Sequence, residues 1–409
     1  MTGVPIVVVG AGHAGFHTAL FLRDEGVEAP IVLVDGLDGP PVQRPPLSKS
    51  MLLGEAEPRL EFRKPEFYAA RDITLLHDTV ARIDRERHLV RLGSGRALGY
   101  RDLVLATGCR ARHLTVPGSG RAGICVLRTP HDARAIRDAL GRADDVVVVG
   151  GGFIGLEAAA AARKRGCTVT VVESLPRLMR RVVSADISDH FRALHEAEGV
   201  RVLTDTTVHA FDGDTRVRQV VLADGTRLRA DLVVLGIGVD PEVELARDSG
   251  LAVGDGIEVD TALRTSDPSI SAVGDCSSFP TRDGTRRRFE SVQNATDQAR
   301  VAAARLAGRT VEFDAVPWFW TDQFAAKLQI AGLVPDPEAE TETARIGDAA
   351  DAFSVLHFHN GRLTAVESVN RPSDHAAARR LLAQDTSLRP DDARIPRFRL
   401  PGTAALRTG

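Results

Sequence analysis

Two glycine-rich turns, each followed by an acidic residue, are the parts of this sequence best suited to hold a ligand. The first reads Gly10-Ala11-Gly12-His13-Ala14-Gly15, and Asp35 closes the segment after it. In a G-x-G-x-x-G turn the first glycine forms the bend, the second lets a pyrophosphate approach the backbone, and the third lets a helix pack close to a strand. The N–H groups at the start of that helix face the phosphates, and the acid accepts ribose hydroxyls.

A second copy of this pattern, Gly150-Gly151-Gly152-Phe153-Ile154-Gly155, is followed by Glu173. Two copies in one chain imply two dinucleotides, or the two halves of a redox pair. A carboxylate at this position accepts ribose hydroxyls and repels a 2′-phosphate, so Glu173 favours NADH over NADPH. Three arginines just downstream, Arg177, Arg180 and Arg181, weigh against a strict preference.

Each turn needs a buried strand before it and a helix after it, and the sequence supplies both. The apolar runs Ile6–Val9 and Val146–Val149 are typical of buried parallel strands. Helices are predicted from about Phe16 to Glu25 and from about Leu156 to Arg165. The strands that follow, Ile31–Val34 and Thr168–Val172, lead directly into the two acids.

Three more segments read as strands that end in small residues. They are Leu103–Gly108, Val233–Gly238 and Ile270–Asp275. Small residues at the carboxyl end of a strand leave room for a bound ligand, and an open sheet binds its ligand at that edge. Asp275 is therefore expected at the ligand edge, and a helix is predicted from about Glu290 to Leu306.

The segment Arg44-Pro45-Pro46-Leu47-Ser48-Lys49 combines two prolines with a lysine. The prolines fix φ and stiffen the backbone as it enters a predicted helix, for which Ser48 could serve as the cap. A stiff segment can hold Lys49 in one place for chemistry. A surface lysine beside a proline turn explains the same residues, and this segment alone does not decide between the two.

The last hundred residues change character. Trp318-Phe319-Trp320 contains both tryptophans of the chain, and the Asn360-Gly361 turn predicts a hairpin of Phe353–His359 with Arg362–Val369. A helix capped by Ser373 is predicted to run to about Gln384. This pattern indicates a separate α+β domain with an antiparallel sheet, and the tail after Pro390 is expected to be a loosely held arm.

Composition narrows the class of protein. The chain has 409 residues and a formal net charge of −3. A charge this small and negative produces no general electrostatic attraction toward nucleic acid or an anionic membrane. No apolar run approaches the roughly 20 residues of a membrane span, and the chain enters its first strand without a signal peptide. The four cysteines match no metal-ligand spacing, and none precedes Cys109, so we expect buried thiols in a reducing, cytoplasmic setting.

The order of these segments resembles the NADH-dependent ferredoxin reductases of the putidaredoxin reductase and rhodocoxin reductase type. These are FAD flavoproteins of the glutathione-reductase-like superfamily, and the likeness covers nearly the full length. The segments that carry it are RPPLSK (Arg44–Lys49), LVLATG (Leu103–Gly108), GGGFIGLE (Gly150–Glu157), AVGDC (Ala272–Cys276), ESVQNA (Glu290–Ala295), PWFWTDQF (Pro317–Phe324), KLQIAG (Lys327–Gly332) and VNRP (Val369–Pro372).

The resemblance implies that the first glycine turn binds FAD and the second binds NADH. It also implies that Lys49 and Glu157 meet near flavin N5 and that Trp320 lies against the flavin edge, so these three are the expected catalytic residues. Asp275 matches the acid that holds the ribityl chain. The expected cofactor-binding residues are Gly10, Gly12, Ala14, Gly15, Asp35, Arg44, Lys49, Val80, Ala106, Arg128, Gly150, Gly152, Ile154, Gly155, Glu157, Glu173, Arg181, Gly236, Gly238, Asp275, Val292 and Trp320; no metal site is expected.

The implied fold class is α/β, with two Rossmann-like dinucleotide-binding domains of the glutathione-reductase type and a C-terminal α+β domain. The FAD domain would be discontinuous, formed by residues 1–110 and 238–308. The NADH domain would span 111–237 and the C-terminal domain 309–409. The implied reaction takes a hydride from NADH to FAD and passes single electrons to a [2Fe–2S] ferredoxin that serves a cytochrome P450 or a Rieske oxygenase. The chain would act as a monomer or homodimer, with no nucleic-acid or membrane partner.

Other functions on the same fold stay open at this stage. Disulfide reductases, peroxidases and NADH oxidases that use thiols are disfavoured, because the Arg44–Lys49 segment holds no cysteine. A rubredoxin reductase or a monodehydroascorbate reductase would share these motifs. A flavoprotein that acts in the manner of apoptosis-inducing factor is disfavoured by the net charge and by the lack of a long basic tract.

A ferredoxin is usually acidic, so its docking face should be locally basic. The densest cationic run is Arg286-Arg287-Arg288, immediately before a segment that the resemblance places against the flavin. Lys327 follows Trp320 closely in a second such segment. We therefore predict that the three arginines and Lys327 border the docking face; a solvated loop is the alternative for the arginine run.

Overall fold

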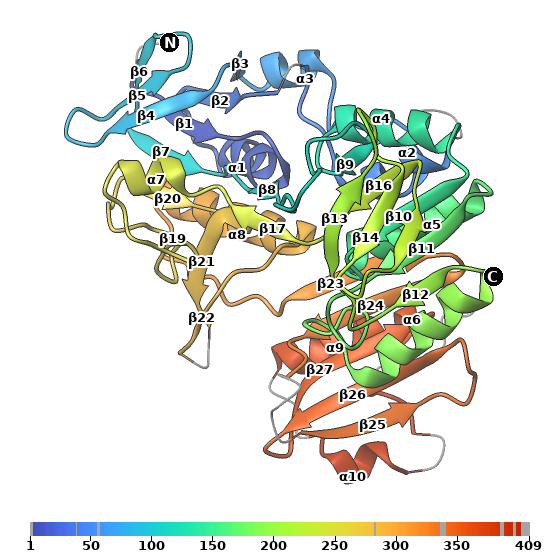
Figure 1. Cartoon of the computed structure of the whole chain (residues 1–409). Helices are drawn as coiled ribbons and strands as arrows, with labels where there is room; N and C mark the ends of the chain where they lie inside the picture. Colours follow the sequence, from blue (N-terminus) through green and yellow to red (C-terminus); the bar gives the residue numbers. More distant parts are fainter. Residues whose placement is uncertain are drawn as a thin grey trace. The chain divides into compact units, whose positions relative to one another are not determined.

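The computed structural model describes residues 3–37, 39–54, 58–281, 284–335, 341–384, 388–395 and 398–401 (Figure 1). It divides into two compact units. The first unit contains residues 1–44, 59–110 and 240–315, and the second contains 45–58, 111–239 and 316–409. The boundaries of the three domains predicted from the sequence stay a prediction.

The first unit is built on a five-stranded parallel sheet in the order β20-β7-β1-β2-β3. Its central strand consists only of isoleucine and valine and is buried on both faces, as expected for a parallel sheet covered by helices. The register aligns Ile6 with Ile31 and with Asp102, so the strands end along one edge. The strands are β1 (Ile6–Val9), β2 (Ile31–Asp35), β3 (Ile73–His77), β7 (Asp102–Leu105) and β20 (Ile270–Ala272).

Helices and smaller sheets complete the first unit, and α1 packs against α8 beside the main sheet (Figure 1). The helical elements are α1 (His13–Asp24), α3 (Pro65–Ala70), α7 (Glu244–Asp248), α8 (Val292–Leu306) and the 3-10 turn η2 (Gly274–Cys276). One antiparallel sheet comprises β4 (Val80–Asp84), β5 (Leu89–Leu92) and β6 (Ala97–Gly99). A mixed sheet, in which β19 and β21 run parallel, comprises β18 (Val253–Gly254), β19 (Gly256–Glu258), β21 (Ser277–Pro280) and β22 (Arg286–Arg287).

The second unit repeats the parallel design in the strand order β12-β11-β10-β16-β9. The strands are β9 (Ile124–Val126), β10 (Asp145–Val149), β11 (Thr168–Val172), β12 (Arg201–Leu203) and β16 (Leu232–Leu235). The helical elements are η1 (Pro45–Ser48), α2 (Ser50–Leu53), α4 (Pro130–Leu140), α5 (Phe153–Lys164) and α6 (Ala185–Ala197). An antiparallel sheet is formed by β13 (Val208–Asp212), β14 (Gln219–Leu222) and β15 (Arg227–Arg229), and the short strands β8 (Cys109–Ala111) and β17 (Val239–Pro241) pair where the chain passes between the units.

The C-terminal part of the second unit is an antiparallel sheet in the order β23-β24-β27-β26-β25, and helix α9 packs on β24 and β27. The predicted Asn360-Gly361 hairpin is confirmed, because Phe353 to His359 pairs with Arg362 to Val369 around it. The elements are β23 (Trp318–Gln323), β24 (Ala326–Gly332), β25 (Glu342–Ile346), β26 (Phe353–His359), β27 (Arg362–Val369), α9 (Pro372–Ala383) and α10 (Pro390–Ala393).

The predicted fold class is confirmed, and a few local predictions are wrong. Both helices after the glycine turns begin three residues earlier than expected, at His13 and Phe153, because the last glycine of each turn already lies in the first helical turn. Ser373 does not cap α9, whose N-cap is Arg371. The tail after Pro390 is not a loose arm in its described part, since Leu400 is 1% exposed in the core of the C-terminal sheet.

Among the described residues, no helix combines the length and the apolar character that a membrane crossing requires. The longest helix, α8, carries polar side chains such as Gln298 and Arg305 along its length.

Helix α9 carries a buried histidine. His375 is 4% exposed, its ring lies edge-on to the Trp318 ring at 5.4 Å, and Arg379 stacks on the same indole at 4.8 Å. Neither ring nitrogen of His375 has a hydrogen-bond partner among the described residues. Burial, reinforced by the Arg379 charge, lowers the pKa of His375 to about 4, so the folded protein holds this imidazole neutral.

We predict that His375 makes the protein less stable in mild acid. Its pKa in the unfolded chain is about 6.5, so between about pH 6.5 and pH 4 the unfolded chain takes up a proton that the folded chain refuses. The free energy of unfolding should therefore fall as pH falls through that window, by on the order of 1 kcal/mol per pH unit. His375→Phe should show a smaller drop in thermal midpoint between pH 7 and pH 5 than the parent.

The matched control is His131→Phe, because His131 is exposed on α4. It should keep the parental drop between the two pH values. An unchanged drop in His375→Phe would show that His375 titrates normally in the folded protein.

Candidate functional site

The first glycine turn is closed so tightly that only glycine fits. Gly10 has φ of +96°, and a Cβ there would lie 2.4 Å from the carbonyl oxygen of Ala106. A Cβ at Gly15 would lie 1.8 Å from the carbonyl oxygen of Gly10. Gly12 is the N-cap of α1 and has no side chain to occupy the N–H groups of the first helical turn. These N–H groups and the adjacent bare backbone form a cradle that suits a pyrophosphate.

Two charged side chains flank this cradle. A Cβ at Gly12 would lie 2.7 Å from Nη1 of Arg44, so the guanidinium lies directly against the turn. Asp35 stands at the end of β2. Burial raises the pKa of Asp35, while the Leu37 amide and the Arg44 charge oppose that rise. An acid and an arginine beside a glycine turn can bind ribose hydroxyls and phosphate oxygens, respectively.

The other predicted residues of the first unit lie along the strand ends. Ala106 follows β7, and Asp275 lies in η2 immediately after β20. A Cβ at Gly274 would lie 2.7 Å from Cβ of Ala14, so the Gly274-Asp275 turn packs on the start of α1. Val292 is the first residue of α8, and Val80 begins β4. The contacts of these residues with the adenosine, pyrophosphate and ribityl parts of FAD stay a prediction.

The second glycine turn has the same closed geometry. Gly150 has φ of +106°, and a Cβ there would lie 2.4 Å from the carbonyl oxygen of Gly236. A Cβ at Gly155 would lie 2.1 Å from the carbonyl oxygen of Gly150. Gly152 is the N-cap of α5, and the Ile154 side chain in the first helical turn is 45% exposed. An exposed isoleucine at the mouth of such a turn is available for contact with a bound nucleotide.

The side chain of Glu173 turns back onto this loop. Its Oε2 accepts the Gly151 N–H at 2.6 Å, its Oε1 accepts the Leu175 N–H at 2.8 Å, and the residue is 8% exposed. The carboxylate thus shapes the turn as well as standing where ribose hydroxyls are expected. Each carboxylate oxygen has a further lone pair beyond the one that accepts a backbone N–H. The proposed role of Glu173 in NADH preference depends on these free acceptor sites, which could accept the ribose hydroxyls.

The arginines after Glu173 have different environments. Arg177 donates to the carbonyl oxygens of Val183, Ser184 and Arg180, so it holds the loop together. Arg181 lies near Gly238, where a Cβ would be 3.8 Å from its Nη2 and 3.7 Å from Nη1 of Arg112. Sequence reasoning named Arg181 and Gly238 and missed Arg112, because no local pattern marks a lone arginine after β8.

Glu157 is the buried acid at the centre of the second unit. It lies one turn into α5, it is 4% exposed, and it accepts a hydrogen bond from Lys49 Nζ to Oε1 at 2.7 Å. Ser48 donates to Oε2, and Thr321 donates to Oε1 at 2.7 Å. The meeting of Lys49 and Glu157 is therefore present in the structure, and the nearness of the pair to flavin N5 stays a prediction.

The prediction that Ser48 caps a helix is wrong. Helix α2 begins at Ser50 with Lys49 as its N-cap residue, and the Ser48 hydroxyl bonds to Glu157 instead. A serine beside two prolines matches the local pattern of a cap, but a buried carboxylate from a distant helix is the stronger acceptor.

The tryptophan segment lies on β23. Trp320 is half-buried, and its ring centroid is 5.5 Å from that of Trp318. Phe319 points the other way and stacks on Phe153, the first residue of α5, at 4.4 Å. Sequence reasoning missed the Phe153–Phe319 contact, which ties the C-terminal sheet to the second glycine turn.

Arg128 supplies a half-buried cation in the second unit. Its Nε and Nη2 atoms are buried and have no hydrogen-bond partner among the described residues. A buried guanidinium needs an acceptor or an anion. This observation fits the predicted role of Arg128 as a cofactor-binding residue.

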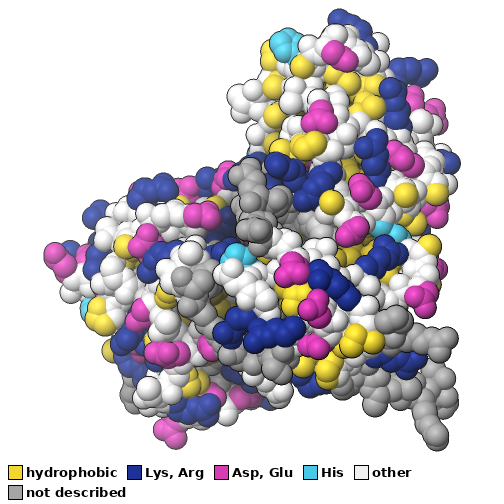
Figure 2. Space-filling view, turned by 90° about the horizontal axis from the view of Figure 1, so that it is seen from below, with side chains coloured by type: hydrophobic (Ala, Val, Ile, Leu, Met, Phe, Trp, Pro, Cys, Tyr) yellow, Lys and Arg dark blue, Asp and Glu magenta, His cyan; other side chains and the backbone are white. Residues whose placement is uncertain are grey.

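Two of the three arginines in the run, Arg286 and Arg287, are exposed, and the place of the run on a docking face stays a prediction. Arg288 is 9% exposed in its side chain and pairs with Glu290 at 2.7 Å and Asp255 at 3.2 Å. Arg286 donates to the carbonyl oxygens of Val259 and Ser278. Figure 2 shows basic and acidic side chains interspersed over the visible face, in line with the small net charge.

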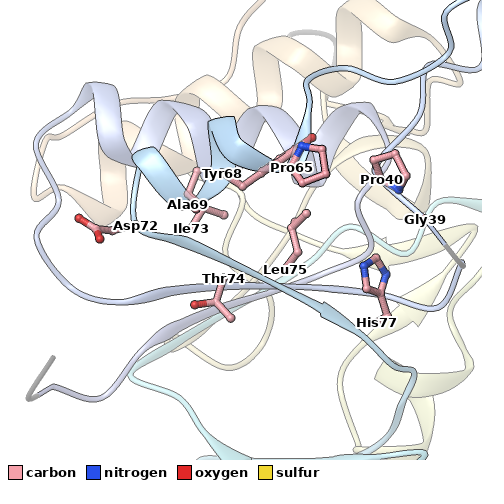
Figure 3. A pocket seen from close by; sticks show the side chains of 10 residues that line it. All are labelled: Gly39, Pro40, Pro65, Tyr68, Ala69, Asp72, Ile73, Thr74, Leu75 and His77. Carbon is pink, nitrogen blue, oxygen red and sulfur yellow. The ribbon is translucent and has the colours of Figure 1, made fainter.

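A pocket of about 530 Å³ opens in the first unit between α3 and β3 (Figure 3). Leu75 of the strand points toward α3, which contributes Tyr68 and Ala69, and His77 lies on the side of Gly39 and Pro40. Burial raises the pKa of Tyr68 to about 12. None of the predicted cofactor-binding residues lines this pocket, so it is distinct from the glycine cradle.

The four cysteines are free thiols. Cys109, Cys167 and Cys276 are buried, and Cys125 is half-buried. Burial raises the pKa of Cys125, Cys167 and Cys276, which disfavours the reactive thiolate.

Comparison with known proteins agrees with this geometry. Residues 4–299 match the family described as pyridine nucleotide-disulphide oxidoreductase, and residues 318–403 match the family described as reductase C-terminal. The chain is 44% identical over 394 residues to rhodocoxin reductase of Rhodococcus erythropolis, covering 95% of this chain and 91% of that protein.

Two solved structures are similar over nearly the whole chain. The crystal structure of the ferredoxin reductase for the CYP199A2 system of Rhodopseudomonas palustris has a TM-score of 0.95 and 43% identity, covering 98% of this chain and 100% of that chain. The covalent putidaredoxin reductase–putidaredoxin complex gives a TM-score of 0.91 and 40% identity, with 96% and 95% of the two chains covered.

The chain belongs to the pyridine nucleotide-disulphide oxidoreductase family, whose members are oxidoreductases built on two dinucleotide-binding folds. Within that family it is of the putidaredoxin reductase and rhodocoxin reductase type. Its cofactors are FAD and NAD(H), and the two closed glycine turns, Asp35 and the buried Arg128 guanidinium fit them.

We predict that Gly15→Ala abolishes retention of FAD. The added Cβ would press on the Gly10 carbonyl, which is backbone and cannot rotate away, so the turn must open. The matched control is Gly99→Ala in the same unit, where a Cβ meets only ordinary contacts of 3.7 and 3.9 Å. The ratio of flavin to protein absorbance after gel filtration measures the effect. Full flavin content in Gly15→Ala would contradict the assignment of this turn to FAD.

Proposed function

We propose that this chain is an NADH-dependent reductase that sends electrons through FAD to a [2Fe–2S] ferredoxin serving a cytochrome P450 or a Rieske oxygenase. FAD, when bound, accepts a hydride from NADH and releases its electrons one at a time, which an iron–sulfur partner requires. The C-terminal match and the ferredoxin reductases among the similar proteins support the partner class.

The observation that carries the proposal is the Lys49–Glu157 pair. A thiol-based member of this family needs cysteines beside its flavin, and the segment Arg44–Lys49 supplies a lysine paired with a buried carboxylate instead. Lys49 is 25% exposed in its side chain, whereas Glu157 is 3% exposed. The ammonium is therefore the end of the pair that a cofactor can reach, and the carboxylate fixes it in place.

The chain's own residues perform the positioning. The glycine turns with the N-termini of α1 and α5 bind the two pyrophosphates, and Asp35 and Glu173 take the ribose hydroxyls. Lys49 supplies positive charge where the reduced cofactor gains negative charge. Trp320 presents a half-buried indole that excludes water from one side of the site. No residue of the chain needs to form a covalent bond in this scheme.

The proposed partner can be tested by cytochrome c reduction. With NADH as donor, we expect slow reduction by the enzyme alone and a large, saturable increase when a [2Fe–2S] ferredoxin is added. The ferredoxin acts as the single-electron carrier between the two proteins. Direct ferricyanide reduction, which needs no docking, serves as the control for a competent flavin site.

Three outcomes would contradict the proposal. One is a cytochrome c rate that ferredoxins do not change although ferricyanide is reduced rapidly. Another is a much higher kcat/KM for a rubredoxin or for monodehydroascorbate. The last is tight DNA binding without ferredoxin activity, as for a protein that acts in the manner of apoptosis-inducing factor.

We predict that NADH is preferred over NADPH by at least about tenfold in kcat/KM, about 1.4 kcal/mol of transition-state binding. Glu173 accepts two backbone N–H groups and stays ready to accept ribose hydroxyls, whereas a 2′-phosphate would meet its buried negative charge. Steady-state ferricyanide reduction with each nucleotide measures the ratio. Equal efficiencies would mean that Arg181 and Arg112 outweigh the carboxylate.

A further inference from the structure

A continuous chain of hydrogen bonds links Glu157 to a distant histidine. Thr321 Oγ1 donates to Glu157 Oε1 at 2.7 Å, and Gln323 Nε2 donates to Thr321 Oγ1 at 3.2 Å. The Oε1 atom of Gln323 is 2.9 Å from Nε2 of His195. All four residues are buried, with exposed fractions of 4% for Glu157, 1% for Gln323 and 0% for the other two.

The direction of every donor in this chain is fixed by its ends. A carboxylate only accepts, so the single hydrogen of the Thr321 hydroxyl goes to Glu157. The hydroxyl oxygen then accepts from the amide nitrogen of Gln323, and the amide oxygen must accept from Nε2–H of His195. An amide oxygen only accepts, so this contact requires the hydrogen on Nε2 of His195, and burial lowers the pKa of His195 against the opposing effect of its bond to Gln323.

The secondary structure makes this arrangement rigid. Thr321 and Gln323 are two residues apart on β23, so they project from the same face of the strand, whereas Trp320 projects from the other. The ring of His195, near the end of α6, packs edge-on against Phe324 at 4.9 Å. The strand that carries Trp320 therefore also supplies one of the donors to Glu157.

We propose that Thr321 and Gln323, with His195 behind them, are positioning residues that orient the Glu157 carboxylate for hydride transfer. This inference rests on the proposed function, which gives Glu157 its place beside the nicotinamide. Lys49 and Thr321 share Oε1 while Ser48 holds Oε2, so the carboxylate cannot rotate without breaking a bond. Removing the Thr321 hydroxyl leaves Glu157 Oε1 with Lys49 as its remaining side-chain donor. It also leaves the Gln323 amide nitrogen without the oxygen that accepts its hydrogen bond.

The test removes the Thr321 hydroxyl and keeps its shape. Thr321→Val should slow reduction of the flavin by NADH about tenfold in stopped-flow experiments, while FAD stays bound and the KM for NADH changes little. Thr321→Ser restores the donor and should recover most of the rate. The matched control is Ser354→Ala, which removes a buried hydroxyl from β26 in the same sheet, bonded there to Ser368 and Asp374.

A double-mutant cycle separates positioning from general destabilisation. Thr321→Val should have little further effect on the rate in a Glu157→Gln background, because the hydroxyl acts through the carboxylate. Fully additive effects, or equal slowing by Ser354→Ala, would overturn the inference. So would a parental rate in Thr321→Val.

The cycle also separates this inference from the proposed function. If Glu157→Gln slows flavin reduction and Thr321→Val does not, the role of Glu157 holds and only the positioning role fails. If Glu157→Gln leaves the rate at the parental value, both the catalytic role of Glu157 and the inference built on it are wrong.

Discussion

The buried carboxylate of Glu157 is the constraint on which the second unit depends. A charge in the interior is tolerated only when it is paired and hydrogen-bonded. Glu157 accepts hydrogen bonds directly from Ser48, Lys49 and Thr321. Thr321 is in turn bonded to Gln323 on the same strand, and Gln323 to His195 of α6. One acid thus joins the proline segment, the second glycine turn and the C-terminal sheet.

Backbone sterics impose the other constraint, and they do so twice. In each parallel sheet, a glycine with positive φ follows the central strand, and a second glycine in the helix passes so close to it that a Cβ would clash with its carbonyl oxygen. This geometry leaves the helix N-terminus bare and places an acid from the next strand beside it. The two units therefore offer the same kind of dinucleotide cradle, and the differences in chemistry come from what lies around each cradle.

Local patterns predicted the parts of the fold and of the site that are local. Both glycine turns, the strands around them and the Asn360-Gly361 hairpin could be read directly, since their geometry is set within a few residues. The Lys49–Glu157 contact joins residues far apart in sequence, so only the resemblance to a family indicated it. The sequence gives no sign that Ser48 and Thr321 converge on one carboxylate, with His195 linked to it through Gln323, because each would be an ordinary core or cap residue elsewhere. The docking role of the arginine run stays a prediction, and the pairing of Arg288 with Asp255, 33 residues earlier in the chain, is a contact that no local pattern indicates.

We propose that the Lys49–Glu157 pair stands where nicotinamide and flavin meet. A crystal structure of the protein that contains reduced FAD and bound NAD⁺ tests this placement of the pair most directly. The account predicts that Lys49 Nζ lies within hydrogen-bonding distance of flavin N5, about 3 Å, while Glu157 keeps its bonds to Lys49 and Thr321 beside the nicotinamide ring. A structure in which the pair lies away from both rings, with the flavin N5 facing other residues, would contradict it.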